Sequence, residues 1–378
     1  MIIGYDAKRA FCNHSGLGNY SRMLIDGVAH GDMSSSLLLY TPKIKQIYYN
    51  YFQAVDNVSV VLPEKIWHLV PAIWRTFGDY RHMKKNNVQI FHGLSHELPY
   101  CLPKGVKKVV SIHDLIVFRY PYYFSKLDSF IYQHKQKHAC KVADMIVAIS
   151  EQTKQDLIDI LKIPENRIKV IYQSVDSIFW NWIKNTDKQT SIAQVRQKYK
   201  LPQRYILCVG TVEKRKNQDN IIKAMTQLPT DVALVVVGRH RGDYIDTLKN
   251  TIRKNNLTYR VYFLPNIAFE DFPALYAAAT ASVYVSYFEG FGIPILESMC
   301  CDTPVLTANV SSMPEVGGDA VLYTAPNDVD AIASQLNKIL SDEDIRQQMI
   351  CLGQQQRSRF TPEIIAEQIL EVYRTLLV

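Results

Sequence analysis

Short apolar runs alternate along the chain with longer segments of helical periodicity. In the first half, seven runs have the length and the β-branched composition of buried parallel strands. They cover residues 1–7, 35–41, 57–62, 88–93, 107–114, 144–150 and 167–174. Helical spacing predicts helices over 17–30, 65–85, 122–142 and 151–161. This alternation predicts a parallel, doubly wound sheet.

The pattern starts again after residues 181–194, NWIKNTDKQTSIAQ, a polar and aperiodic stretch that we interpret as a linker. Further strands are predicted at 204–210, 231–238, 260–266, 281–286 and 304–309, with helices near 217–227, 243–254, 270–279 and 294–300. The last stretch predicts an amphipathic helix with no strand after it. We therefore expect an α/β protein with two doubly wound domains, at 1–180 and 181–357, and a helix at 358–378 that crosses back to the first domain.

Composition narrows the class of protein. The 378 residues are 47% hydrophobic, which is enough for two cores. No apolar run approaches the roughly 20 residues that cross a bilayer, and the early charges Asp6 and Lys8 favour a first strand over a signal peptide. The seven cysteines are scattered without a C-x-x-C pair, so zinc and disulfide frameworks are disfavoured and a reducing cytosol is expected.

The net charge of +7 lies entirely in the first half of the chain. Residues 1–180 hold 22 Lys and Arg against 15 Asp and Glu, whereas residues 181–378 hold 21 of each. The excess is either an ordinary solvated surface or a face that meets an anionic partner.

Four candidate sites fall at predicted strand ends, where doubly wound sheets bind ligands. The first three are HSGLGNYS (14–21), a glycine loop that opens a helix, SIHDL (111–115), and GTVEKRKN (210–217) with its basic triplet. The fourth is EGFGIPILE (289–297), in which Glu289 and Glu297 flank two glycines at a helix start. Each motif alone is weak, because a glycine loop, a strand-end histidine or a basic triplet is often structural.

The fourth stretch poses a chemical question, because a glycine-rich helix start attracts phosphate whereas carboxylates do not. Carboxylates are instead good acceptors for neighbouring hydroxyl groups. A ligand with phosphates between two polyols would satisfy the amides, the basic side chains and both glutamates. Nucleotide-diphosphate sugars have that form.

Other features have ordinary structural explanations. Cys300 and Cys301 are expected to pack rather than react. Asp328 and Asp330 have D-x-D spacing, but they precede a helix as capping residues do. The segment 67–80 holds Trp67, Trp74 and Arg75, which are either core or, with Lys84 and Lys85, a contact with an anionic membrane.

Taken together and in their order along the chain, these motifs resemble a known family, the retaining glycosyltransferases of family 4. The resemblance covers nearly the whole chain and rests on GLGNYS, SIHDL, AISEQTKQDL (148–157), IKVIYQSVD (168–176), GTVEKRKN, SYFEGFGIPILESMCCDTPV (286–305) and SSMPEVGGDA (311–320). It implies the GT-B fold, two Rossmann-like domains that face each other across a cleft. It also implies transfer of a hexose from a nucleotide-diphosphate sugar, with a lean toward mannose from GDP-mannose.

The resemblance also implies roles for individual residues. Glu289 would hold the transferred sugar and Glu297 the nucleotide ribose, while Arg215 and Lys216 grip the diphosphate. The remaining donor-side residues would be Gly16, Gly18, Gly210, Gly290, Phe291 and Gly292, with His113 near the transferred sugar. His92 and Asp114 are assigned to the acceptor side. No cofactor, metal or nucleic acid is expected; the partners would be the donor and a glycan or lipid-linked acceptor.

Two departures from the family pattern stand out. Many members have arginine where this chain has Thr211, and N-G-V-D where it has Gln173 to Asp176. Three other functions stay open from the residues alone. These are a nucleotide-sugar epimerase, a glycosidase that uses Glu289 and Glu297, and a non-catalytic module that binds sugar nucleotides.

Overall fold

The computed structural model describes residues 1–378 except 14–15, 49, 53–54, 64–69, 78–79 and 241. The described residues form two compact units. Unit 1 comprises Met1–Ser174 together with Phe360–Val378, and unit 2 comprises Val175–Arg359. The change of unit therefore falls six residues before the expected boundary at 180, and the C-terminal segment belongs to unit 1.

Among its described residues, unit 1 forms a seven-stranded, fully parallel sheet with the order β3-β2-β1-β4-β5-β6-β7. The strands are β1 (Ile2–Asp6), β2 (Ser36–Tyr40), β3 (Val58–Val61), β4 (Ile90–Gly93), β5 (Lys107–Ile112), β6 (Met145–Ala148) and β7 (Ile168–Val170). The central strands are buried almost throughout, as expected when helices cover both faces of a parallel sheet.

Unit 2 repeats the plan with six parallel strands in the order β10-β9-β8-β11-β12-β13, again among the residues described. The strands are β8 (Tyr205–Val209), β9 (Ala233–Val237), β10 (Val261–Leu264), β11 (Ala281–Tyr284), β12 (Val305–Ala308) and β13 (Leu322–Thr324). The predicted doubly wound parallel sheets are thus confirmed in both halves of the chain.

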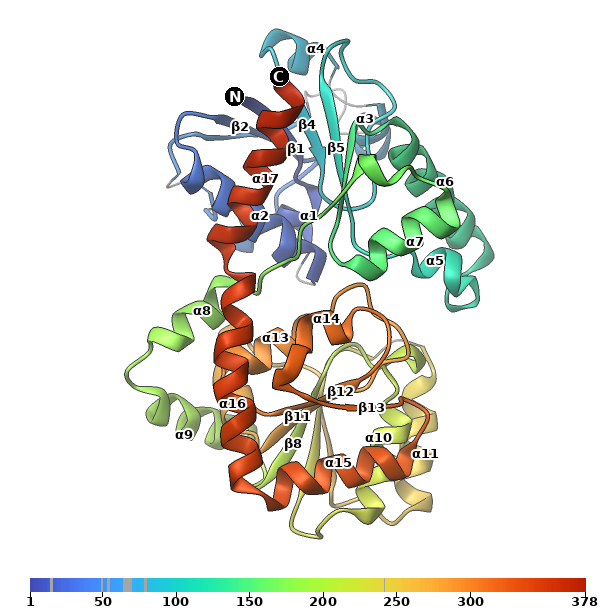
Figure 1. Cartoon of the computed structure of the whole chain (residues 1–378), viewed down its shortest axis with the longest axis vertical. Helices are drawn as coiled ribbons and strands as arrows, with labels where there is room; N and C mark the ends of the chain where they lie inside the picture. Colours follow the sequence, from blue (N-terminus) through green and yellow to red (C-terminus); the bar gives the residue numbers. More distant parts are fainter. Residues whose placement is uncertain (14–15, 49, 53–54, 64–69, 78–79, 241) are drawn as a thin grey trace. The chain divides into compact units, whose positions relative to one another are not determined.

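Helices flank each sheet (Figure 1). Unit 1 has α1 (Lys8–Cys12), α2 (Gly16–Gly31), α3 (Pro71–Phe77), α4 (Tyr80–Lys85), α5 (Ile116–Arg119), α6 (Lys126–Val142), α7 (Glu151–Leu161) and α17 (Pro362–Leu377). Unit 2 has α8 (Ser177–Lys184), α9 (Lys188–Tyr199), α10 (Gln218–Ala224), α11 (Tyr244–Lys254), α12 (Phe272–Ala277), α13 (Ile293–Cys300), α14 (Met313–Gly317), α15 (Val329–Ser341) and α16 (Glu343–Arg357). In the described chain no helix combines the length and apolar character that crossing a bilayer requires.

The interpretation of residues 181–194 as a linker is wrong. Most of this stretch is helical, in α8 and α9. α8 buries Phe179 and Trp182, but α9 buries only Val195, which explains its lack of periodicity. α9 is held instead by polar contacts, such as Arg196 Nη2 to the Ala278 carbonyl oxygen at 2.6 Å.

The C-terminal helix α17 packs against α2 of unit 1 (Figure 1). Two glycines of α2 make this approach close: a Cβ atom on Gly27 would lie 3.0 Å from Ala366, and one on Gly31 would lie 3.1 Å from Leu370. The hydroxyl group of Tyr373 then reaches the core, 3.0 Å from the Tyr5 hydroxyl. The last helix is thus part of the unit that the first strand begins.

Each sheet has a switch point, where neighbouring strands are followed by connections that leave in opposite directions. In unit 1 it lies between β1 and β4, and in unit 2 between β8 and β11. Ligands of doubly wound proteins bind at the carboxyl ends of such strands. A ligand site is therefore expected in the segments that follow these four strands.

Candidate functional site

The segments that follow β8 and β11 meet at the switch point of unit 2. After β8, Gly210 has φ +146°, and residues Lys214–Lys216 form one 3-10 turn that ends at Asn217 with φ +61°. The buried Asn217 amide donates to the carbonyl oxygens of Val285 (2.9 Å) and Pro326 (2.7 Å). Asn217 therefore locks the basic turn to the end of β11.

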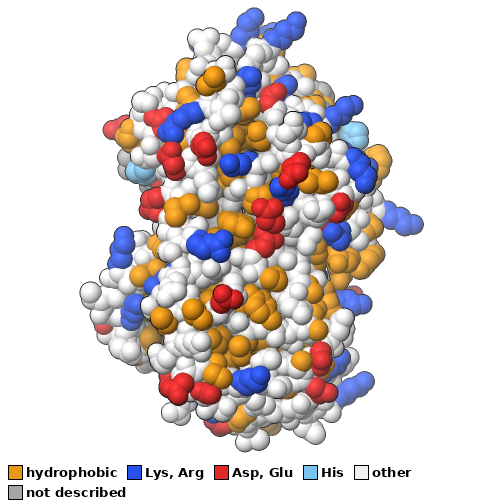
Figure 2. Space-filling model, viewed as in Figure 1, with side chains coloured by type: hydrophobic (Ala, Val, Ile, Leu, Met, Phe, Trp, Pro, Cys, Tyr) orange, Lys and Arg blue, Asp and Glu red, His pale blue; other side chains and the backbone are white. Residues whose placement is uncertain are grey.

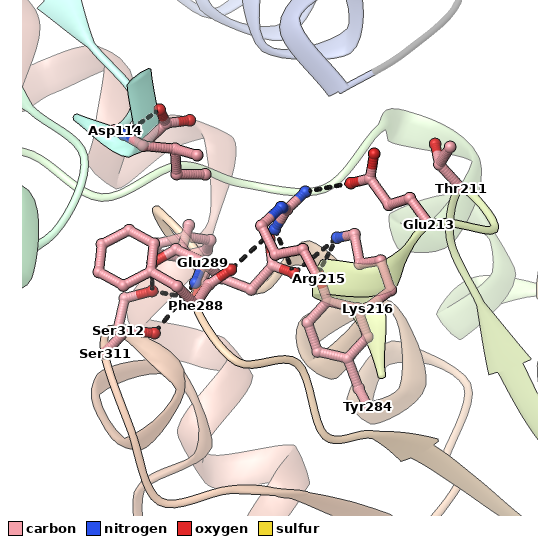
Figure 3. A network of polar contacts seen from close by, with 12 residues as sticks. Asp114, Thr211, Glu213, Arg215, Lys216, Tyr284, Phe288, Glu289, Ser311 and Ser312 are labelled. Atoms are coloured by element: carbon pink, nitrogen blue, oxygen red, sulfur yellow. Dashed lines mark hydrogen bonds and ion pairs between the residues drawn. The ribbon is translucent and has the colours of Figure 1, made fainter. Parts of the chain in front are cut away.

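Three charged side chains converge at this point (Figure 3). One carboxylate oxygen of Glu289 lies 2.7 Å from Lys216 Nζ and 2.8 Å from Arg215 Nη1. Lys216 also donates to the Tyr284 hydroxyl at 2.6 Å, and Arg215 pairs with Glu213 at 2.7 Å. All three central side chains are mostly buried, so solvent screens their charges little.

The electrostatic balance keeps Glu289 ionised. Burial alone would raise the pKa of Glu289, but the charges of Arg215 and Lys216 together outweigh it and lower that pKa to about 2. The pKa of Lys216 is lowered, first by burial and then by the neighbouring charge of Arg215, against the pull of Glu289. The cluster thus holds one anion between two cations.

Serine side chains fix the loop that carries Glu289. Ser312 Oγ donates to the carbonyl oxygens of Glu289 (3.0 Å) and Phe291 (2.7 Å), and the Glu289 amide donates to Ser311 Oγ at 3.1 Å. Gly292 then has φ +119°, which disfavours a side chain, and directly precedes α13 as its N-cap residue. No side chain caps α13, so its first amides and its positive end suit an anion.

Glu297 lies one turn into α13 and has a different environment. Tyr276 donates its hydroxyl hydrogen to Glu297 Oε2 at 2.7 Å. Burial raises the pKa of Glu297 to about 7, opposed by that hydrogen bond. The two glutamates of the motif are therefore held by different partners, Glu289 by cations and Glu297 by a phenol.

In unit 1 the glycine motif opens α2, although residues 14–15 lie outside the described residues. A Cβ atom on Gly18 would stand 2.0 Å from the Asn13 carbonyl oxygen, whereas one on Gly16 would meet no atom of the described residues within 4 Å. Arg22 anchors the same turn through the carbonyl oxygens of Ala10 (2.7 Å) and Asn13 (3.1 Å). Gly18 is thus required by packing, while the part of the chain that the structure describes sets no such requirement at Gly16.

His113 and Asp114 follow β5 at the same edge of the unit 1 sheet. His113 Nε2 lies 2.9 Å from the Leu94 carbonyl oxygen, and its ring packs edge-on against Tyr20 at 4.6 Å. Burial lowers the pKa of His113 to about 3, so the ring is neutral near pH 7. Asp114 accepts the Ile116 amide at 3.0 Å, which shapes the turn into α5.

His92 does not have the position expected of an acceptor-side residue. Its side chain is fully buried, with Nδ1 2.6 Å from the Tyr373 hydroxyl and Nε2 2.9 Å from Ser111 Oγ. Burial lowers its pKa to about 3. His92 points into the core because it lies inside β4, and it links α17 to the sheet rather than facing a ligand.

A different charged group occupies the switch point of unit 1. Arg75 of α3 binds Asp6, at the end of β1, with Nε at 3.0 Å and Nη2 at 2.7 Å. Its Nη1 binds Glu97, after β4, at 2.7 Å, and Lys135 of α6 reaches the same Glu97 oxygen at 3.1 Å. Tyr100, stacked on His138 at 3.9 Å, lines the adjoining cavity. We call Asp6, Arg75, Glu97 and Lys135 the unit 1 charge cluster.

Both aspartates of the D-x-D pair accept hydrogen bonds from other groups of unit 2. Asp328 caps α15 by accepting the Ala331 amide at 2.9 Å, and Asp330 accepts from Gln227 at 2.7 Å. The capping explanation is therefore confirmed for Asp328, while Asp330 lies in the first turn of α15. Within the described ranges, no group of three or more His, Cys, Asp or Glu side chains is arranged to hold a metal ion. Cys300 and Cys301 are buried, as predicted.

The segment 67–80 has two interpretations from the sequence, core or membrane contact. Trp74 is buried and Arg75 is held by Asp6 and Glu97, which agrees with the core interpretation for these two residues. Trp67 lies outside the described residues.

Comparisons with known proteins agree with this architecture. Residues 191–356 match the family described as glycosyl transferases group 1, and residues 15–178 match glycosyltransferase family 4. The chain is 34% identical over 292 residues to the O-antigen chain mannosyltransferase B of Escherichia coli, covering 76% of this chain and 74% of that protein. The chain belongs to glycosyltransferase family 4.

More distant matches extend the same relationship. The O-antigen chain mannosyltransferase RfbU of Salmonella typhimurium is 25% identical over 308 residues, 78% of this chain and 80% of that protein. The crystal structure of HepE from Anabaena, in complex with UDP and glucose, matches with a TM-score of 0.74 and 21% identity over 99% of both chains. This likeness shows that the family 4 enzyme has the GT-B fold. A family 4 glycosyltransferase is a transferase, so the glycosidase and non-catalytic alternatives fall away.

Several residues around the site of this glycosyltransferase escaped the sequence analysis. Tyr284 and Tyr276 resemble core residues in the pattern, and nothing local shows that their hydroxyl groups face Lys216 and Glu297. The unit 1 charge cluster was missed because its members are far apart in the sequence. Asp6 at the end of the first strand was the available signal.

Proposed function

We propose that this glycosyltransferase transfers a hexose, specifically mannose from GDP-mannose, to a hydroxyl group of a glycan or of a lipid-linked oligosaccharide. The observation that carries the proposal is the cluster of Arg215, Lys216 and Glu289 at the unit 2 switch point. The sugar is proposed because two relatives are named O-antigen mannosyltransferases.

The donor would use the charges already gathered there. Its diphosphate would lie against Arg215, Lys216 and the uncapped start of α13, with the amides of residues 290–292. Glu297 would accept the ribose hydroxyl groups and Glu289 those of the hexose. Because Glu289 now holds both cations, diphosphate binding would relieve it of part of that pairing and leave its oxygens to the sugar.

Charge stabilisation is then the main chemical contribution. The bond between the anomeric carbon and the diphosphate oxygen breaks, and the acceptor oxygen forms the new bond to that carbon with retention. The acceptor proton passes to the departing diphosphate, whose growing charge faces Arg215 and Lys216. Fixed charges in a buried site are effective at this task. Gly16, Gly18 and Gly210 would border the phosphates, and His113 would be a neutral hydrogen-bonding group near the sugar.

The acceptor would be recognised by unit 1. We assign its polar contacts to the unit 1 charge cluster in place of His92, with Asp114 as a neighbour. Carboxylates accept from sugar hydroxyl groups and Arg75 donates to them, while Tyr100 offers a face for a sugar ring. We propose that the enzyme works in the cytoplasm at the inner face of the membrane, where lipid-linked acceptors are exposed.

A donor screen tests the proposal directly. The binding of GDP- and UDP-sugars is compared by calorimetry. The sugar nucleotide that binds best is then incubated with lipid-linked oligosaccharides from the host, and the mass of the product is measured by mass spectrometry. We expect GDP-mannose to bind best and the acceptor to gain one hexose, with or without EDTA. A donor sugar that changes configuration without any acceptor would instead indicate an epimerase. Complete loss of activity in EDTA, restored by Mg²⁺, would contradict the metal-free mechanism.

A further inference from the structure

Both cations of the candidate site bind the same oxygen of Glu289. Arg215 Nη1 and Lys216 Nζ lie 2.8 and 2.7 Å from Oε1. Among the hydrogen bonds and ion pairs of the described residues, none reaches the other oxygen, Oε2. An ionised carboxylate can accept about four hydrogen bonds, two at each oxygen. One oxygen of this carboxylate is therefore left without a partner by the part of the chain that the structure describes.

A serine hydroxyl close to Glu289 also lacks a partner. Ser286 lies two residues beyond the end of β11, is fully buried, and its Oγ makes no hydrogen bond with any described residue. It is nevertheless near Glu289: burial raises the pKa of that carboxyl, the charges of Arg215 and Lys216 lower it, and the Ser286 hydroxyl lowers it further. An unpaired buried hydroxyl is costly and rare in folded proteins.

The backbone on either side of Ser286 is fixed to the basic turn. The Val285 carbonyl oxygen accepts from the Asn217 side-chain amide at 2.9 Å, and the Tyr287 amide donates to the Arg215 carbonyl oxygen at 2.9 Å. The position of Ser286 is therefore set by its neighbours. The carboxylate of Glu289 can turn toward it more easily, because rotation about the last bond of a glutamate side chain is broad.

Lys216, in contrast, has a hydroxyl partner of its own. Its Nζ donates to the Tyr284 hydroxyl at 2.6 Å and lies 4.8 Å from the centre of the same ring (Figure 3). The bonds to Tyr284 and Glu289 use two of the three hydrogens of the ammonium group, which leaves one for a phosphate oxygen. Lys216 therefore keeps a partner if Glu289 moves away, and only Glu289 needs a new one.

Burial prevents water from being that partner. The Lys, Arg, Asp and Glu side chains over the surface in Figure 2 face solvent, which can replace a partner that they lose. Glu289 is only 7% exposed, and Ser286 is not exposed at all. In such surroundings a carboxylate needs a hydrogen bond from the protein or from a ligand.

We propose that Ser286 is a positioning residue for Glu289, whose carboxylate accepts the Ser286 hydroxyl hydrogen once the donor diphosphate takes over Arg215 and Lys216. The inference rests on the proposed function, in which the diphosphate binds the two cations and the hexose binds Glu289. With one oxygen held by Ser286, the other faces the hydroxyl groups of the hexose. Ser286 thus acts through Glu289 and does not itself contact the sugar.

The substitution Ser286→Ala distinguishes this role from a purely structural one. Because the hydroxyl has no hydrogen bond to lose, the melting temperature of the free protein should stay equal or rise. The kcat for transfer from GDP-mannose should fall about tenfold or more, the usual effect of losing a hydrogen bond to a charged group. The affinity for GDP, measured by calorimetry, should stay unchanged. A lower melting temperature with unchanged kcat would overturn the proposal.

Ser282→Ala is the matched control from the same strand. Ser282 is also buried, but its Oγ lies 2.7 Å from Ser298 Oγ, so this hydroxyl does have a partner. The control should lose melting temperature and keep kcat, the opposite of Ser286→Ala. An equal fall of kcat in both variants would mean that any disturbance of β11 impairs turnover, and the assignment to Ser286 would be wrong.

A double-mutant cycle with Glu289→Ala tests whether Ser286 acts through Glu289. Ser286→Ala should lower kcat about tenfold in the wild type but cause no further loss in the Glu289→Ala background, because nothing is left to position. A full additional loss there would overturn the proposal while leaving the proposed role of Glu289 intact. Unchanged kcat in Glu289→Ala alone would instead contradict the proposed function itself.

Discussion

At the scale of single residues, the site depends on how one carboxylate is shared. Glu289 is held by Lys216 and Arg215 at 2.7 and 2.8 Å, so the cations that are proposed to bind a diphosphate already bind an anion of the protein. Arg215 has a second task, because its Nη1 also donates to the Phe288 carbonyl oxygen at 2.7 Å. Lys216 has no such backbone contact among the bonds described for it. Substituting Arg215 and substituting Lys216 should therefore have different effects on the stability of the protein.

We predict that Lys216→Ala lowers kcat/KM more than tenfold with little loss of stability, because a charge-assisted contact in such a site contributes about 2 kcal/mol or more. Arg215→Ala should lower both turnover and the melting temperature. Lys214→Ala is the control, since this neighbour in the basic triplet is exposed. Steady-state kinetics and calorimetry decide; equal loss of activity in the Lys214 and Lys216 variants would move the diphosphate elsewhere.

The substitution Glu289→Gln distinguishes the proposed contacts to the sugar from those to the phosphates. Removing the carboxylate charge frees both cations, so affinity for the nucleoside diphosphate alone should stay equal or rise, while turnover falls strongly. Isothermal calorimetry with the diphosphate measures the first effect. A marked loss of diphosphate affinity would mean that Glu289 orders the cations for the ligand and does not compete with it.

Glu297 should make the free energy of unfolding depend on pH. Its pKa is raised to about 7, so the folded protein keeps a proton that the unfolded chain releases near pH 4.5, and stability falls as pH rises between these values. Glu297→Gln removes this effect. We expect the variant to gain melting temperature over the wild type at pH 8 and little or none at pH 4.5. Glu270→Gln, at an exposed position, should show no such difference; a gain independent of pH would contradict the account.

At the scale of elements, the alternation of strands and helices was largely predictable, because strands buried on both faces are continuous apolar runs. β9 illustrates this, because all five of its positions are apolar and buried. The elements that were missed have weak patterns. β13 has three residues, and α9 has one buried side chain and is held by contacts that α12 and its neighbours provide. Such elements take their structure from tertiary partners, which a local pattern does not contain.

The residues of the candidate site likewise differ in whether a local sequence pattern can reveal them. Gly292, Arg215 and Lys216 could be found because loop chemistry is local, whereas Tyr284 and the unit 1 charge cluster depend on strand order. His92 was misjudged for a related reason: its place at a strand end was clear, but the direction of its ring was not.

The glycine turn before α2 offers a test at this scale. Gly18→Ala should destabilise unit 1, because the new Cβ atom would lie 2.0 Å from the Asn13 carbonyl oxygen, a backbone atom that cannot move freely. Gly16→Ala should fold normally and should even gain slightly from the helix propensity of alanine. If the donor phosphates approach this turn, Gly16→Ala should still raise KM for the donor. Thermal melting and donor kinetics distinguish the cases, and unchanged kinetics would remove Gly16 from the donor site.

At the scale of the whole molecule, the C-terminal helix completes the first unit through a buried polar chain. Tyr373 connects to His92, His92 to Ser111 at 2.9 Å, and Ser111 to the Tyr20 hydroxyl at 2.7 Å. All four side chains are buried, so water cannot replace a hydrogen bond that is lost between them. These hydrogen bonds connect α17, β4, β5 and α2, elements that are distant in sequence. Their loss should therefore destabilise unit 1 as a whole but not unit 2.

We predict that Tyr373→Phe costs about 1–3 kcal/mol of unit 1 stability, because it leaves His92 Nδ1 and the Tyr5 hydroxyl without a partner while keeping the packing of the ring. Hydrogen exchange read by mass spectrometry should show faster exchange in peptides from β4, β5 and α17, with peptides from β8 and β9 unchanged. Tyr122→Phe, which removes an exposed hydroxyl from the same unit, is the matched control and should leave every peptide unchanged. Equal loss of protection in both units would mean that the two units unfold as one, so that the fastening of α17 stabilises the whole chain and not unit 1 alone.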